Sequence, residues 1–413
     1  MEAKKFQVYG YRWVVLAAFA LLNAVMQMHW VTFAPITGEA AAFYGVTPLQ
    51  IGFLSMSFMI VYVLVCFPAS FLIDRYGLAI GVGLGAVLTG VFGMLKGVYP
   101  RNYTVVCVCQ FGLAVGQPFI LNAITKVGAN WFPIQERATA AGLASLAQYV
   151  GIVIAMVATP YLTIAYAIPG MLLGYGVLSV AVAVVFLALM RDRPPTPPCA
   201  PGEEKRTPFT EGLRQVLRQP DMRRLLLLFF IGLGMFNAVT TWIEQILAPR
   251  GIGSTQAGMI GGLMMIGGII GASVIPVLSD RARRRVPFLL LTTACTVPGL
   301  VGITFAGSYG ILLASGFILG FFFMSAGPLG FQYGAEVSYP ASESIPQGLL
   351  MLSGQISGIL FIFGMDRFRA AGSGSMTPSM IAFVGLLVLN IYLCTRLRES
   401  TLIQAEKATP DRD

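Results

Sequence analysis

Charged residues are scarce in this sequence. Asp, Glu, Lys and Arg make up 11% of the 413 residues, whereas hydrophobic residues make up 56%. A soluble globular domain carries roughly 25% charged residues, so the deficit excludes an ordinary soluble domain and indicates that lipid is the solvent. The formal net charge of +9 therefore gives no ground for expecting nucleic-acid binding, and its meaning depends on which loops carry it.

Histidine and cysteine are scarce as well. His29 is the only histidine, which excludes a metal site with several histidine ligands and a Ser-His-Asp triad. The six cysteines form no CxxC pair and five lie in apolar runs, so we expect buried thiols rather than disulfides or metal ligands. No nucleophile and base are arranged for catalysis. The sequence therefore predicts a protein that is not an enzyme and holds neither a cofactor nor a metal.

Long apolar runs are abundant. A helix needs about 20 predominantly apolar residues to cross a bilayer, and the first run is too long for a signal peptide, so no cleaved leader is expected. The runs predict an all-α membrane protein with twelve transmembrane helices, at residues 13–36, 50–73, 78–97, 103–130, 138–161, 165–190, 225–247, 255–279, 286–306, 309–333, 345–365 and 376–395.

A hydrophilic segment, residues 191–224, divides these runs into two sets of six. Its first part is rich in proline and must be extended. Residues 209–219 then place apolar side chains on one helical face, which is typical of a helix that lies at a membrane interface. We therefore predict an N-terminal six-helix bundle (1–190), a cytoplasmic linker with an amphipathic helix (191–224), and a C-terminal six-helix bundle with a short tail (225–413).

Lysine and arginine are distributed unequally between the two faces of this arrangement. The termini, the central segment and the loops on one face carry most of them, and by the positive-inside bias that face is cytoplasmic. We therefore expect both termini in the cytoplasm and the chain in the plasma or inner membrane of a cell. The opposite face has five of the 27 lysines and arginines, namely Lys96, Arg101, Arg250, Arg367 and Arg369.

The two halves repeat each other. Residues 72–77 and 278–283 match at an offset of 206 positions. Repeats with the same topology are related by a pseudo-twofold axis along the membrane normal, so we predict that relationship for the two bundles. A second match, between residues 132–151 and 339–358 at an offset of 207, pairs Pro133 with Pro340, Glu136 with Glu343, Gln148 with Gln355, and Gly151 with Gly358.

The first of these matches contains Asp74, Arg75 and Gly77, and its copy contains Asp280 and Arg281. These residues resemble the short cytoplasmic signature of the major facilitator superfamily, whose fold is the arrangement of two six-helix bundles predicted above. The resemblance implies that the acidic residue and the arginines tie helix ends together and separate when the protein switches state.

Three longer stretches carry a narrower resemblance: residues 116–133 (GQPFILNAITKVGANWFP), 320–344 (GFFFMSAGPLGFQYGAEVSYPASES) and 348–361 (GLLMLSGQISGILF). They are similar to the transporters related to the feline leukaemia virus subgroup C receptor. Members of that family move choline, ethanolamine and related small solutes; haem has also been proposed, and another branch is linked to pyridoxine.

This narrower resemblance implies roles for several residues. Amides that match Gln117 and Gln355 face a central cavity in the family, and a basic residue matches Lys126, near the cytoplasmic end, where it gates the inner mouth or reaches the interface. The family cages a quaternary ammonium with two aromatic residues, whose positions fall on Gln27 and Asn237 here. Since cation–π recognition needs such rings, and Trp30 and Trp242 are only nearby in the sequence, the resemblance leaves open whether choline itself is bound.

Polar residues form a stripe on the first helix of each predicted bundle. Lipid cannot satisfy these groups, so they must face protein or water. Two such stripes predict a hydrated cavity between the bundles; the alternative is hydrogen bonding between helices without a ligand. The stripes are Gln27, Trp30, Ala34 and Thr37 in the first half, and Gly234, Asn237, Thr241 and Glu244 in the second.

Further amides interrupt the apolar runs. Gln117 lies at mid-depth beside Pro118, which removes a backbone donor, and Gln148 and Gln355 are repeat mates. Asn122, farther along the same run, is placed either to bind solute or to bond to another helix. The candidate solute-binding residues are therefore Gln27, Trp30, Gln117, Asn122, Gln148, Asn237, Thr241 and Gln355.

Two titratable residues are candidates for proton coupling or charge pairing. His29 is adjacent to Trp30 but points about 100° away from it, and it is either a packing residue or a protonation switch. Glu244, if buried, carries a proton or neutralises a cationic solute. The alternative is that Glu244 extends to the outer interface.

These features predict a secondary active or facilitative transporter, a symporter or uniporter, that moves a small polar organic solute by alternating access. An amine or zwitterion is favoured, and a monomer in the lipid bilayer is expected. One alternative is a proton-coupled symporter of an organic anion, although an arginine at mid-membrane is missing. Another is a receptor or scaffold that no longer transports.

Overall fold

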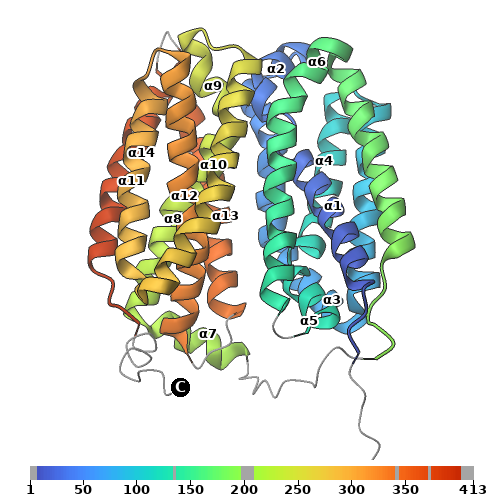
Figure 1. Cartoon of the computed structure of the whole chain (residues 1–413). Helices are drawn as coiled ribbons and strands as arrows, with labels where there is room; N and C mark the ends of the chain where they lie inside the picture. The colour runs from blue at the N-terminus through green and yellow to red at the C-terminus, as the bar shows by residue number, and fades with distance from the viewer. Residues whose placement is uncertain (1–6, 134–135, 197–208, 340–343, 371–373, 401–413) are drawn as a thin grey trace, which may run out of the picture. The chain divides into compact units, whose positions relative to one another are not determined.

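The computed structural model of the chain describes residues 7–133, 136–196, 209–339, 344–370 and 374–400. The chain divides into two compact units, Met1–Glu203 and Glu204–Asp413. Each unit is a bundle of long helices (Figure 1), and the described residues contain no strand. The boundary between the units falls inside the hydrophilic segment 191–224.

Unit 1 is held together by close helix contacts. α1 packs mainly against α6, and α3 packs against α4 and α6. A Cβ at Gly151 of α6 would collide with the carbonyl of Ala24 in α1, so the absence of a side chain lets these backbones approach. The elements are α1 (Arg12–Val31), η1 (Ala34–Ile36), α2 (Thr37–Tyr44), α3 (Pro48–Val98), α4 (Tyr103–Leu121), α5 (Ile124–Trp131) and α6 (Arg137–Leu189).

Unit 2 packs α10 against α12 and α8 against α13. The amphipathic helix predicted at residues 209–219 is present as α7, and its Val216 is fully buried in a cluster with Met222 and Leu225 of α8. The elements are α7 (Phe209–Arg218), α8 (Pro220–Thr241), α9 (Ile243–Leu247), η3 (Ala248–Arg250), α10 (Ser254–Ala282), α11 (Val286–Phe305), α12 (Tyr309–Ser338), α13 (Ser344–Arg367) and α14 (Thr377–Thr395).

Two helices are too long for a single crossing of a membrane. α3 has 51 residues and α6 has 53, whereas about 20 residues cross the hydrocarbon core. Each is broken by one residue with a positive φ, Gly77 (89°) in α3 and Ala167 (53°) in α6. Ten helices of the described chain are long and apolar enough to span a membrane. With α3 and α6 counted as two segments each, twelve spanning segments result, as predicted.

Candidate functional site

The first helix of unit 1 ends before the predicted polar stripe is complete. α1 ends at Val31, Ala34 begins η1, and Thr37 begins α2. Pro35 explains the ending, because a proline ring clashes with the carbonyl four residues earlier, that of Val31. The hydroxyl of Thr37 donates to the Phe33 carbonyl at 3.1 Å. The prediction of one continuous stripe is therefore wrong beyond α1, which holds Gln27 and Trp30 but not the last two positions.

Three side chains of unit 1 offer hydrogen-bonding groups that the described chain does not use. Gln27 of α1 and Gln117 of α4 are 3% and 5% exposed, and neither side chain has a hydrogen bond to a described residue. The indole Nε1 of Trp30 is also buried without a partner. α1 and α4 approach each other next to these amides, since the Met26 methyl lies 3.2 Å from a Cβ built on Gly116.

Asn122, by contrast, is fully bonded within unit 1. Its Nδ2 donates to the carbonyl of Cys66 and to Ser70 Oγ, both at 2.9 Å, and its Oδ1 accepts from the hydroxyl of Tyr62 at 3.2 Å. All three partners are on α3. Of the two roles expected for Asn122, these contacts favour the bond to another helix.

Unit 2 repeats the pattern of underused polar groups. Asn237 of α8 is 4% exposed and donates one long hydrogen bond, 3.4 Å, to the carbonyl of Gly354 on α13. Thr241 Oγ1 is buried without a partner among the described residues. Gln355 on α13 and its repeat mate Gln148 on α6 are half-buried, and neither side chain is hydrogen bonded to a described residue.

The outer polar positions of unit 2 form a separate network. α8 ends at Thr241, so Glu244 lies on the separate helix α9 and the predicted stripe is interrupted here too. Glu244 is 8% exposed and accepts from Gln245 Nε2 at 2.6 Å, and Gln245 Oε1 in turn accepts from Arg369 at 3.1 Å. Arg369 also lies 5.2 Å from the ring of Trp242, whose indole N–H donates to Ile362.

His29 is buried in unit 1 and bonded on both ring nitrogens. Nε2 lies 2.6 Å from Ser179 Oγ, and Nδ1 lies 2.9 Å from Lys96 Nζ. The sequence placed Lys96 among the charges of the outer loops, which is wrong: Lys96 has no exposed surface. A position at the end of an apolar run does not show whether a lysine points out of the bundle or back into it.

The signature residues of unit 1 bind two helix ends together. Lys126 of α5 forms an ion pair with Asp74 of α3 at 2.8 Å and donates to the Ile73 carbonyl at 2.6 Å. Arg75 lies over the ring of Tyr76. Lys126 therefore links α5 to the end of the first half of α3, where the sequence predicted a basic residue near the cytoplasmic mouth.

In unit 2, Arg285 ties helix ends together, a role that the sequence had assigned to Arg281. Arg281 is exposed, whereas the buried Arg285 pairs with Asp280 and, at 3.1 Å, with Glu336 of α12. Burial of the Arg285 guanidinium acts to lower its pKa, but hydrogen bonds and charge attraction from Asp280 and Glu336 outweigh burial and raise the pKa. The arginine therefore stays charged at physiological pH.

Two carboxylates that sequence reasoning missed cap helix starts at equivalent positions. Asp192 Oδ1 accepts from the backbone N–H of Ala79 at 2.7 Å, and Glu399 accepts from the backbone N–H groups of Arg285 (2.7 Å) and Val286 (3.3 Å). The offset from 192 to 399 and from 79 to 286 is 207 in both cases, the offset of the repeat. Applying that offset to every acidic residue would have revealed the pair.

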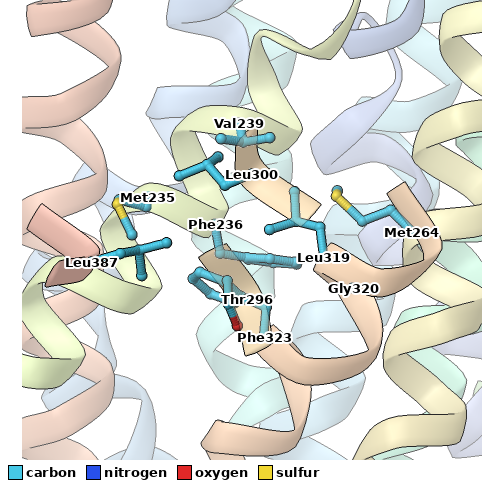
Figure 2. Close-up of a pocket in the computed structure, with 10 residues that line it drawn as sticks. All are labelled: Met235, Phe236, Val239, Met264, Thr296, Leu300, Leu319, Gly320, Phe323 and Leu387. Carbon is cyan, nitrogen blue, oxygen red and sulfur yellow. The ribbon is translucent and has the colours of Figure 1, made fainter. Parts of the chain in front are cut away.

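The described residues contain no group of three or more His, Cys, Asp or Glu side chains that could hold a metal. The pocket in unit 2 drawn in Figure 2 is apolar and has about 10 Å³ of free volume, roughly the space for one water molecule. The hydroxyl of its Thr296 is already bonded to the Thr292 carbonyl. This pocket therefore offers no site for a polar solute.

Comparisons with known proteins show what the chain resembles. Residues 12–362 match a family model described as Major Facilitator Superfamily. The chain is 32% identical over 378 residues to solute carrier family 49 member A3 of Danio rerio, covering 87% of this chain and 79% of the relative. It is 30% identical over 403 residues to choline/ethanolamine transporter FLVCR1 of Felis catus, covering 91% and 72%.

A solved structure supports the fold. The crystal structure of a bacterial homolog of the human lysosomal transporter Spinster, inward-facing and unoccupied, superposes with a TM-score of 0.73, covering 95% of this chain and 98% of the other. The sequence identity is 15%, so this likeness concerns the fold alone.

Proposed function

Because the chain belongs to the major facilitator superfamily of membrane transporters, we propose that it carries a small polar organic solute across a membrane by alternating access. An amine or zwitterion is the favoured solute, and transport is either facilitative or coupled to an ion gradient. The chain works as a monomer in the plasma or inner membrane, with both termini in the cytoplasm.

The observation that supports this proposal most is the set of buried polar groups without partners. Leaving a buried polar group unpaired costs roughly 1–3 kcal/mol, and the Trp30 indole N–H and the Thr241 hydroxyl are both in that state among the described residues. The side chains of Gln27 and Gln117 add two more amides that have no hydrogen bond to another described residue. A polar solute would provide partners for the three groups of unit 1, and the Thr241 hydroxyl offers one more unpaired group in unit 2.

The chemistry of these groups favours a primary amine over a quaternary ammonium. Amide oxygens, as in Gln117, accept hydrogen bonds from a primary ammonium, and the Trp30 N–H donates to a hydroxyl or carboxylate. A quaternary ammonium has no N–H and is recognised by ring faces, and Trp30 is the only candidate solute-binding residue with a ring. The name of the relative FLVCR1 gives two solutes, choline and ethanolamine. Of these two, ethanolamine fits the residues of this chain better.

Two other functions remain as alternatives. A symporter of organic anions needs a cation that the solute can reach; Lys96 is fully buried and Lys126 is paired with Asp74. A receptor or scaffold would bind a solute without moving it.

A ligand screen followed by flux measurements tests the proposal. A solute that binds the folded protein raises its melting temperature with concentration, so the purified chain is screened against amines, betaines, vitamins and carboxylates. Uptake of radiolabelled ethanolamine and choline is then measured in proteoliposomes. We expect stabilisation and saturable uptake with ethanolamine. Stabilisation by carboxylates alone would favour the anion symporter, and binding without flux would favour the receptor.

A further inference from the structure

The second half of α3 carries a lysine into the core of unit 1, against the single histidine. Lys96 Nζ lies 2.9 Å from His29 Nδ1 of α1 and donates to Gln110 Oε1 of α4 at 3.0 Å. The ring of Phe33 lies 5.7 Å from the same nitrogen. Lys96 has no exposed surface, and no carboxylate of the described residues is bonded to Lys96 or His29. This is a buried basic pair without a counter-ion.

The hydrogen bonds around His29 determine which of its nitrogens carries the proton. Ser179 Oγ donates its hydrogen to the Tyr175 carbonyl at 2.7 Å. The same oxygen can therefore only accept a hydrogen bond from His29 Nε2, which lies 2.6 Å away. Nε2 therefore carries the hydrogen, and a neutral His29 presents the lone pair of Nδ1 to Lys96. An ammonium group has three donors and no acceptor, so a charged Lys96 donates to Nδ1.

The same geometry limits the pair to one positive charge. If the proton is on Lys96, its ammonium donates to Nδ1; if it is on His29, the Nδ1–H donates to a neutral lysine amine. Protonating both would place two cations 2.9 Å apart in a buried site, where like charges repel strongly. A charged group without a counter-ion is itself costly to bury, and releasing the proton to water removes that cost.

The other groups around the pair come from α4, α6 and α2. From α4 come the buried thiol of Cys109, which interacts electrostatically with Lys96, and the amide of Gln110. From α6 comes Tyr175, whose ring lies 6.3 Å from that of His29 and whose hydroxyl is bonded to Thr159. On α2, Glu39 is exposed. No ion pair between described residues therefore joins Lys96 or His29 to an acidic side chain.

One residue links the pair to the candidate solute site. Gln110, which accepts from Lys96, donates its Nε2 hydrogen to the backbone carbonyl of His29 at 2.9 Å. The next residue is Trp30, whose own carbonyl accepts from Ser55 at 3.0 Å, and α1 ends one residue later, at Val31. Side chains around the pair thus hold the backbone of the last turn of α1.

We propose that His29 and Lys96 bind one exchangeable proton, and that loading and release of this proton reposition the last turn of α1 beside Trp30. Loading forms one N–H bond with a proton taken from water, and release returns that proton. The consequence for transport rests on the proposed function: the proton is the coupling ion, and Gln110 connects it to the residue that contacts the solute.

Nitrogen NMR of the full chain in lipid nanodiscs tests the shared proton without any solute. His29 is the only histidine, so ¹⁵N-histidine labelling gives one imidazole. We expect the Nε2–H tautomer, with the Nδ1 resonance of His29 and the Nζ resonance of Lys96 changing at the same pH. In Lys96→Gln, which keeps a donor but cannot ionise, the Nδ1 change should disappear. Separate midpoints, or the same Nδ1 change in the variant, would overturn the proposal.

The link to α1 is measured in the same samples. The Trp30 indole resonance, assigned by its loss in Trp30→Phe, should change at the midpoint of the pair. An indole resonance that is constant through that pH would overturn the link. The joint titration and the indole midpoint are both read from the wild-type chain, so these two results do not depend on whether Lys96→Gln folds.

Coupling to transport is tested with radiolabelled ethanolamine in proteoliposomes at zero membrane potential. With one proton per solute, an inward gradient of one pH unit should drive about tenfold accumulation, and Lys96→Gln should reduce this to none. Arg101→Gln, which removes an exposed cation, is the matched control and should keep the tenfold accumulation.

Saturable wild-type uptake that does not change with the pH gradient would overturn coupling and leave the proposed function intact. Absence of wild-type uptake, with joint titration of His29 and Lys96 by NMR, would refute the proposed solute and support the proton site.

Discussion

The carboxylate of Asp192 lies where a side chain at position 77 would have to be: a Cβ built on Gly77 would be 2.6 Å from Asp192 Oδ1. That oxygen accepts from the backbone N–H of Ala79, at the start of the second half of α3, where a negative charge also interacts favourably with the helix dipole. The break in α3 therefore depends on both the empty space at residue 77 and the carboxylate at residue 192.

Replacing Gly77 with alanine should destabilise unit 1. The backbone angles of Gly77, φ 89° and ψ 176°, are in a region that is essentially restricted to glycine and costs a residue with a side chain roughly 1–3 kcal/mol. Displacement of Asp192 adds the loss of a cap, about 1 kcal/mol. We expect Gly77→Ala to lower the melting temperature in a thermal-shift assay. Gly174→Ala in α6, where a Cβ would meet nothing within 4 Å, is the control. Equal melting of Gly77→Ala and wild type would show that the contact is unnecessary.

Arg285 and Arg281 should differ sharply when each is changed to alanine. Arg285→Ala leaves Glu336, whose side chain is 9% exposed, as a buried carboxylate without its cation, and removing one partner of a buried ion pair costs about 3–5 kcal/mol. Arg281 is exposed, so Arg281→Ala should change little. Urea unfolding of both variants measures the difference, and similar midpoints would contradict this assignment.

Trp242 and Trp30, which are both buried, should respond in opposite ways to replacement by phenylalanine. Trp242→Phe removes the hydrogen bond to the Ile362 carbonyl and should cost roughly 1 kcal/mol or more of stability. Trp30→Phe removes an indole N–H that has no partner among the described residues, so stability should be unchanged or higher while affinity for the solute falls. Melting curves and solute titrations on the same samples separate the two effects; unchanged affinity in Trp30→Phe would remove Trp30 from the site.

The amides at Gln117 and Gln355 should matter for uptake more than for folding. Gln117→Ala and Gln355→Ala are each expected to reduce ethanolamine uptake about tenfold, as loss of one or two hydrogen bonds to a charged group implies, with normal amounts of folded protein. Gln256→Ala, an exposed glutamine on α10, provides the comparison. Normal uptake in both variants would exclude these amides from the site.

Glu244 provides a test between two proton carriers. If His29 and Lys96 hold the coupling proton, Glu244→Gln should keep the dependence of uptake on a pH gradient, because its neighbour Gln245 can still bond to the new amide. If Glu244 carries the proton, the variant should lose pH dependence and keep solute exchange. Uptake measured across a range of external pH values distinguishes the two.

Much of the fold could be predicted because the lengths of the apolar runs, and the repeat that relates the two halves, can be read directly from the sequence. The apolar runs predict twelve spans, and the break at Gly77 lies between two of them. What could not be predicted is where a helix ends inside a run. Pro35 lies in the first predicted span (13–36), and only the structure shows that α1 stops at Val31 and that η1 and α2 follow it.

The candidate site could be predicted in its residue types but not in its contacts. Gln27 and Gln117 are conspicuous amides in apolar runs, and both are buried with no side-chain hydrogen bond to another described residue. The pairs Lys96–His29 and Asp192–Ala79 join residues 67 and 113 positions apart, and no local pattern records such a distance. Arg285 was missed for another reason, since four arginines lie between residues 281 and 285 and the sequence does not show which one turns inward.

Ala167 is the whole connection between the two spans of α6. Ala167 is the one residue with non-helical backbone angles inside α6 (φ 53°, ψ 173°), so no loop lies between Tyr166 and Ile168 to absorb a relative displacement of the two spans along their axes. The later span, which carries Ser179, must therefore follow the earlier one, and an epitope tag or protease site inserted at residue 167 would uncouple them.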